Sequence, residues 1–234
     1  MAGSFAGFEQ QGLTFLQQVR IENDKEWFEA HRDVYQQSLL TPLRALVDTL
    51  ALAMLEIDPQ FETRPAIGKT LSRIHRDTRF SHDKSRYRSR MWLTFKRPGK
   101  DWTDAPAYFF ELGPDMLRYG LGYYSASKAT MDLFRHTLKQ RPQPFLAVAQ
   151  QCCQGGFELV GESYKRLLVK DLDPVISSWY HRKSFAVMVT SSDVEPLFHP
   201  QLAQTLTHGF RQLEPLYQWL MNVESMKQID PADL

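Results

Sequence analysis

The sequence predicts an α+β protein in which N-terminal helices and later helices pack on a mostly antiparallel sheet. Residues 43–57 repeat apolar side chains at helical spacing, whereas residues 91–95 alternate apolar and polar side chains as a strand does. Two further apolar stretches, 107–112 and 116–123, flank Gly113, Pro114 and Asp115, which are typical of a hairpin turn. Helices followed by consecutive strands favour the α+β class. We expect a single domain over residues 1–234, with a core at about 8–222.

The N-terminal part predicts three helical stretches. The first covers residues 9–20. Asn23 is expected to cap the second, because Glu26 follows three residues later as in a capping box. Pro42 suits the first turn of a helix and is expected to restart or kink the chain before residues 43–57.

The later part of the chain predicts short strands between helices. Ser125 or Ser127 is expected to cap a helix that runs to about residue 138, and Pro142 to open another that runs to about 154. Short strands are expected near 157–160 and 185–190. The tail, 196–222, predicts a helix kinked at Pro215.

Composition favours a globular cytoplasmic protein. Hydrophobic residues make up 43% of the chain and aromatic residues 12%. We expect no membrane span, since no apolar run approaches about 20 residues, and no signal peptide, since the N-terminus lacks a basic and apolar leader. The two cysteines, Cys152 and Cys153, are adjacent and predict packing residues instead of a disulfide or a metal site.

Positive charge is concentrated in the middle of the chain. Residues 64–100 hold twelve Lys or Arg and two Asp or Glu, which gives +10, whereas the whole chain has a net charge of +1. A near-neutral protein with a local basic segment is more typical of an anion site than of a nucleic-acid coat.

The centre of this basic segment is an arginine-rich motif at residues 73–90. If residues 73–79 are extended, Ile74 and Arg76 point to one side, and Arg73, His75 and Arg79 to the other. A half-buried Arg76 needs a carboxylate or an anionic ligand. The ligand-binding prediction is a set of basic side chains that converge on a phosphate or carboxylate: Arg73, Arg76, Arg79, Lys84 and Arg88. The alternative is internal pairing with acids such as Asp77, Asp83 and Glu26.

Acid–base candidates in the motif are weak. His75 and Asp77 are the catalytic candidates, and His82 with Asp83 forms a second His–Asp pair. The four residues lack a recognised metal-ligand spacing, so we predict no metal site. The sequence identifies no cofactor and no reaction, and leaves open whether the protein is an enzyme.

Two stretches resemble the hallmark motifs of a bacterial and fungal family catalogued as domain of unknown function 2461. They are Asn23-Asp-Lys-Glu-Trp-Phe28 and the run from Arg73 to Arg88. Lys165-Arg166 and Arg182-Lys183-Ser184-Phe185 resemble its C-terminal signature. The chain departs from the pattern at Arg86, where the family usually has proline, and at Leu168 and Val169, where it has a Pro-x-Gly turn. The resemblance implies no activity, because the family is itself uncharacterised.

Three functional hypotheses follow from the residues. The first is binding of a small anionic ligand, phosphate-bearing or carboxylate, through the arginine-rich motif. The second is a nucleic-acid-binding module that adds Lys96, Arg97 and Lys100 to the same segment. The third is a structural or protein-interaction domain whose arginines pair internally. The oligomeric state is not predicted.

Overall fold

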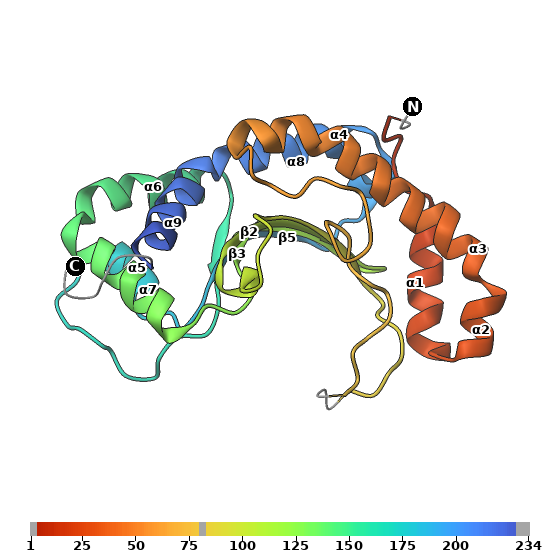
Figure 1. The fold of residues 1–234 in the computed structure, drawn as a ribbon, viewed down its shortest axis with the longest axis horizontal. Coiled ribbons are helices and arrows are strands. Elements are labelled where there is room, and N and C mark those ends of the chain that lie inside the picture. Colours follow the sequence, from red (N-terminus) through yellow and green to blue (C-terminus); the bar gives the residue numbers. More distant parts are fainter. Residues whose placement is uncertain (1–3, 80–82, 228–234) are drawn as a thin grey trace. The chain divides into compact units, whose positions relative to one another are not determined.

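A computed structural model of the protein describes residues 4–79 and 83–227. Its five strands form one antiparallel sheet in the order β1-β2-β3-β5-β4, and helices precede, interrupt and follow the strands in the sequence (Figure 1). The strands are β1 (Met91–Phe95), β2 (Pro106–Leu112), β3 (Leu117–Tyr123), β4 (Glu158–Val160) and β5 (Ala186–Ser191). The predicted α+β class is therefore confirmed.

The strands follow from local sequence patterns. In β1, Met91, Leu93 and Phe95 are buried while Trp92 and Thr94 are half-buried, as the alternation predicts. The predicted turn between β2 and β3 is closed by the Gly113 N–H, which donates to the Met116 carbonyl at 2.8 Å.

The chain divides into two compact units, each assembled from three segments. The first unit holds Met1–Phe95, Phe109–Tyr119 and Thr190–His208. The second holds Lys96–Tyr108, Gly120–Val189 and Gly209–Leu234. The expectation of a single domain remains a prediction.

The N-terminal helices of the first unit are α1 (Gln10–Glu22), α2 (Lys25–Ala30), α3 (Arg32–Tyr35), a π-helical turn η1 (Gln36–Leu40) and α4 (Thr41–Ile57). Helices α1 and α3 pack against each other (Figure 1). The expected Asn23 cap is wrong, because the carboxylate of Asp24 accepts the Trp27 N–H and caps α2. Asn23 instead ends α1 in the left-handed region, at φ 42°, which asparagine tolerates better than most residues.

The helical run Arg32–Ile57 has 26 residues and a mean hydropathy of 1.5 in its most apolar window, enough by length and composition to cross a membrane. The expectation of no membrane span stays a prediction, since a buried core helix meets the same criteria of length and composition. One side of the run, including Leu39, Leu43 and Leu50, is fully buried in the protein. The apolar stripe predicted for 43–57 thus packs as core.

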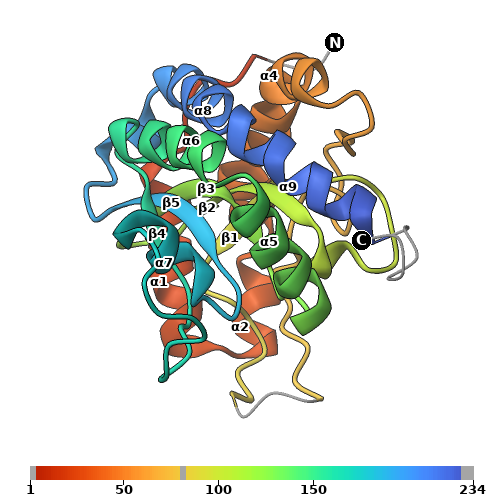
Figure 2. The same cartoon turned by 90° about the vertical axis from the view of Figure 1, so that its left-hand side faces the viewer.

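The second unit contains α5 (Lys128–Gln140), α6 (Pro142–Gln154), α7 (Pro174–Tyr180) and α9 (Glu214–Met226), which pack against one another (Figure 2). Ser127 caps α5 by accepting the Thr130 N–H, and Pro142 opens α6, both as predicted. Helix α7 begins after Asp173, whose side chain accepts the N–H groups of Val175 and Ile176, and no helix was predicted over these residues.

The remaining elements are short or lie near the C-terminus. They are the 3₁₀ turns η2 (Trp102–Asp104) and η3 (Glu195–Phe198) and the helix α8 (Gln201–Gln212). The tail is therefore two helices, not one helix kinked at Pro215, because this proline stands in the first turn of α9, where its missing N–H costs nothing.

Candidate functional site

The arginine-rich motif forms a short antiparallel ladder in the first unit. His75 and Tyr87 are paired; the Arg76 N–H donates to the Arg86 carbonyl at 2.8 Å, and the Arg88 N–H donates to the Ile74 carbonyl at 2.9 Å. In such a ladder, alternate residues point to opposite sides. His75 and Tyr87 therefore share one side, and Ile74, Arg76 and Arg88 share the other.

Asn23 fastens this ladder to the end of α1. Its side-chain oxygen accepts the N–H groups of Arg86 and Tyr87, and its side-chain amide donates to the Tyr87 carbonyl at 3.1 Å. These bonds join two segments that are 64 residues apart at Asn23 and Tyr87, and these segments are the two hallmark stretches found in the sequence. The left-handed conformation of Asn23 thus serves the ladder as well as the helix end.

Aromatic packing holds the His75 and Tyr87 side of the ladder against α2. The Phe28 ring stacks on Tyr87, with centroids 4.4 Å apart and planes 9° apart. The His75 ring meets Phe28 edge-on at 5.5 Å and Tyr87 at 5.1 Å. This support fixes the ladder, and with it the backbone from which Arg76 and Arg88 project.

Arg76 and Arg88 lie on the opposite side and are half-buried. They are diagonal neighbours across the ladder, a separation of about 7–8 Å that long side chains bridge. The Arg88 guanidinium lies 4.8 Å from the centroid of the Trp92 ring. Among the described residues, neither Nε has a hydrogen-bond acceptor, although both atoms are shielded from solvent.

Arg76 has one ionic partner within the described chain. Its Nη1 lies 3.3 Å from Oδ2 of Asp83, whose side chain is 53% exposed. A single contact at this length leaves the two-pronged guanidinium geometry unused. Within the part of the chain that the structure describes, Arg76 and Arg88 therefore present two neighbouring positive charges, each with an Nε–H that lacks an acceptor.

The other basic residues of the predicted set lie differently. Arg73 and Arg79 are exposed. Arg79 donates from Nε and Nη2 to the two oxygens of Asp77, at 3.0 and 2.8 Å. The Lys84 ammonium donates to the Thr78 carbonyl at 2.8 Å. Of the five predicted residues, the ladder brings Arg76 and Arg88 together on one side.

The acid–base candidates do not form a catalytic pair around these arginines. The hydrogen bond from the Arg79 side chain lowers the pKa of Asp77 to about 2, so its carboxylate is a weak base at neutral pH. His75 lies on the aromatic side of the ladder, away from Arg76. His82 falls outside the described residues.

A second arginine cluster in the first unit was not anticipated from the sequence. The buried Glu111 carboxylate of β2 accepts two hydrogen bonds from Arg118 of β3, from Nε at 3.0 Å and Nη2 at 2.7 Å. Its other oxygen lies 3.6 Å from Nη1 of Arg90. The one sequence signal was an acidic residue inside an otherwise apolar strand, which needs a buried partner.

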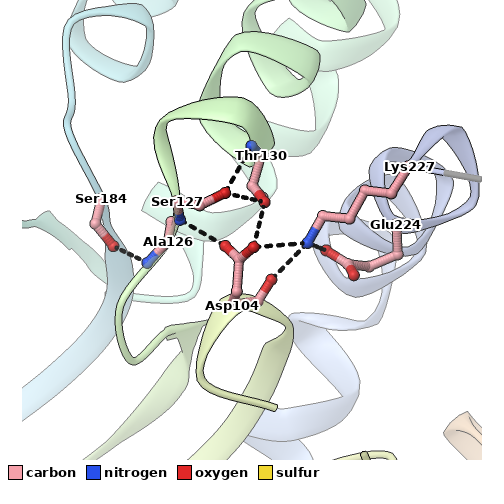
Figure 3. A network of polar contacts seen from close by, with 7 residues as sticks. All are labelled: Asp104, Ala126, Ser127, Thr130, Ser184, Glu224 and Lys227. Carbon is pink, nitrogen blue, oxygen red and sulfur yellow. Dashed lines mark hydrogen bonds and ion pairs between the residues drawn. The ribbon is translucent and has the colours of Figure 1, made fainter. Parts of the chain in front are cut away.

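The second unit contains a polar network centred on Asp104 (Figure 3). Its carboxylate accepts the Ser127 N–H and the Thr130 hydroxyl, and the Lys227 ammonium donates to its backbone carbonyl at 2.7 Å. Lys227 also lies 2.9 Å from Glu224. Burial raises the pKa of Asp104 but these hydrogen bonds outweigh it and the net shift is downward. The network joins η2, α5 and the end of α9, so its evident role is structural.

A hollow of about 290 Å³ in the second unit has a different character. Its walls include Cys152, Phe157, Leu159 and Trp179, and it is almost wholly apolar. Burial raises the pKa of the Cys152 thiol to about 12, which leaves it inert as a nucleophile at neutral pH. The prediction that both cysteines are packing residues therefore fits Cys152, which is buried, but is wrong for Cys153, which is exposed.

The fold and the ladder define an α+β protein with a half-buried arginine pair of unassigned chemistry. Comparison with protein families extends this definition: the family described as "Conserved hypothetical protein (DUF2461)" matches residues 11–219. Because the match covers most of the chain, the protein belongs to this family, and the resemblance found in the sequence is confirmed. A search of curated proteins found no match.

Proposed function

We propose that the protein binds a small oxyanion, a phosphate-bearing or carboxylate ligand, through Arg76 and Arg88. The observation that carries this proposal is that both guanidinium groups hold a shielded Nε–H without an acceptor among the described residues. A buried N–H that lacks an acceptor costs about 1–3 kcal/mol, and two neighbouring cations also repel each other. An oxyanion with several oxygens would relieve both costs.

The fixed geometry of the ladder favours this role. Arginine presents parallel N–H groups that match the spacing of carboxylate and phosphate oxygens. The backbone carrying Arg76 and Arg88 is held by Asn23 and by the stacked ring of Phe28, so the charges are preorganised before a ligand arrives. Arg73, Arg79 and Lys84 lie outside the pair and would contribute to the local field.

The nucleic-acid alternative stays a prediction. Lys96, Arg97 and Lys100 belong to the second unit, and the Lys96 ammonium lies 3.1 Å from the centroid of the Trp102 ring. A steep dependence of RNA or DNA binding on salt would favour this alternative.

The test is a thermal-shift screen of inorganic phosphate, pyrophosphate, nucleotides, sugar phosphates and carboxylates. A ligand present at 100 times its Kd should stabilise the protein by about 2.7 kcal/mol. Arg76→Lys and Arg88→Lys keep the charge but lose the two-pronged donor, so each should reduce binding at least tenfold while the protein stays folded.

Arg79→Lys is the matched control, because Arg79 is exposed and pairs with Asp77. It should change anion binding by less than about twofold. Equal losses in all three variants would indicate a general charge effect, and the absence of any stabilising anion would contradict the proposal.

A further inference from the structure

Asp83 stands beside the proposed anion site in an unusual way. Its Oδ1 accepts the Ser85 N–H at 2.9 Å and the Ser85 hydroxyl at 2.6 Å. Its Oδ2 is the atom that lies 3.3 Å from Arg76. The carboxylate is thus oriented by Ser85, with its second oxygen turned toward the guanidinium.

The other Asp–Arg pair of the motif shows what full pairing looks like. Asp77 receives two hydrogen bonds from the Arg79 side chain, one on each carboxylate oxygen. Asp83 makes a single, longer contact with Arg76 and leaves the Arg76 Nε without an acceptor among the described residues. Asp83 therefore neutralises Arg76 in part without completing its hydrogen bonds.

We infer that Asp83 is a built-in competitor for the anion site: its carboxylate occupies Arg76 in the free protein, and the anionic group of the ligand displaces it. This inference rests on the proposed function. A ligand oxyanion can offer two oxygens to the Arg76 fork and can reach Arg88 as well, which a carboxylate fixed by Ser85 does not do. The displaced contact is partly exposed and weak, so the exchange favours the ligand.

The competitor is charged at neutral pH. Hydrogen bonds from the Ser85 hydroxyl and N–H lower the pKa of Asp83, and the charge of Arg76 adds to this effect. A monoanion whose interaction with Arg76 is no stronger than that of the Asp83 carboxylate therefore does not displace Asp83. An exposed ion pair contributes little free energy. Removing the charge of Asp83 should therefore raise the affinity for the anion by only about two- to fivefold.

The decisive variant is Asp83→Asn. Asparagine keeps an oxygen that accepts the Ser85 N–H, so the turn is retained while the charge is lost. Binding of inorganic phosphate and of citrate should be measured by calorimetry at one ionic strength. Asp83→Asn should bind the preferred probe about two- to fivefold more tightly than the unmodified protein, and Arg76→Lys in the same background should abolish the gain.

Asp77→Asn is the matched control, since it removes one carboxylate of equal charge that pairs with Arg79. Its affinity should rise by less than Asp83→Asn does. If the unmodified protein binds a probe through Arg76 but Asp83→Asn binds it equally or more weakly, Asp83 is not a competitor. The proposed anion site would then still stand. Equal gains in both Asp variants would overturn it too, as a general charge effect. If neither the unmodified protein nor Asp83→Asn binds either probe, both the proposed function and this inference fail.

Discussion

Arg76 in the first unit and Arg135 in the second are both withdrawn from solvent, but their N–H groups meet different surroundings. Arg135 has a side chain only 6% exposed and donates to the Tyr180 carbonyl at 2.9 Å, the Arg182 carbonyl at 2.7 Å and Asp132 at 2.7 Å. Arg76 has a side chain 27% exposed and, within residues 4–79 and 83–227, one ionic contact, with a half-exposed carboxylate. Complete pairing marks an arginine that holds a fold, and incomplete pairing marks one that can accept a ligand.

The largest expected effect follows from Arg135. Substitution by alanine leaves the carbonyls of Tyr180 and Arg182 without their donor and should lower the free energy of unfolding by about 3–5 kcal/mol. Arg76→Ala should lower it by less than about 1 kcal/mol, because Asp83, its ionic partner among the described residues, is exposed. Chemical denaturation of both variants measures the difference. Similar losses would break the comparison and make Arg76 a structural residue.

The Asp104 network should give the next effect. Asp104→Ala removes the acceptor of the Ser127 N–H and the Thr130 hydroxyl and should cost about 1–3 kcal/mol of unfolding free energy. Asp104→Asn keeps one acceptor oxygen and should cost less. The two variants, followed by urea denaturation, separate the hydrogen bonds from the charge; a larger loss for asparagine than for alanine would contradict this assignment.

Local sequence patterns predicted much of the fold because they depend on near neighbours. Ser127 caps α5 and Pro142 opens α6, and the burial of Ile74 next to a half-buried Arg76 follows directly from strand alternation. The signal for α7 is also local, since Asp173 followed by Pro174 is a common helix start.

Long-range contacts explain what local patterns could not predict. Asn23 and Asp24 are equally good helix caps, and bonds from Asn23 to the distant Tyr87 segment decide between them. The same limit applies to the site. The motif predicted a cluster of basic residues, but only the ladder shows that Arg76 and Arg88 share a side and that Arg118 belongs to Glu111.

Asn23 tests whether the ladder is truly preorganised. Asn23→Ala removes the three bonds to Arg86 and Tyr87 and places a β-carbon at φ 42°, so it should cost about 1–3 kcal/mol. Asn23→Gly removes the same bonds without the conformational strain. Both variants should weaken anion binding through Arg76, measured by calorimetry, and glycine should lose less stability than alanine. Full anion affinity in Asn23→Gly would show that the bonds from Asn23 do not position the arginine pair.

The smallest effect concerns Glu224, which shares Lys227 with Asp104 but has the opposite shift. Burial raises the pKa of Glu224, although Lys227 opposes the rise. A carboxyl group whose folded pKa is raised binds its proton more tightly in the folded state. Stability is therefore lost as the pH rises from the usual value of 4.5 through the folded pKa. Glu224→Gln removes this pH-dependent loss of stability. The free energy of unfolding of the variant, relative to that of the unmodified protein, should therefore increase with pH. The increase should stay below about 1 kcal/mol, because the variant also loses the ion pair with Lys227.

Asp104 supplies the internal control for this pH dependence. Its pKa is lowered, so its contribution to stability is present above 3.8 and disappears as the pH falls through the folded pKa. At neutral pH, Asp104→Asn should therefore have a lower free energy of unfolding than the unmodified protein, and Glu224→Gln a higher one. Both differences should shrink as the pH falls. Unfolding free energies measured from pH 3 to 8 by urea titration decide the matter. If both variants have a lower free energy of unfolding than the unmodified protein at neutral pH, Glu224 stabilises the network as Asp104 does. The desolvation cost of its carboxylate would then be offset by its partners, as the hydrogen bonds of Arg135 offset the burial of that side chain.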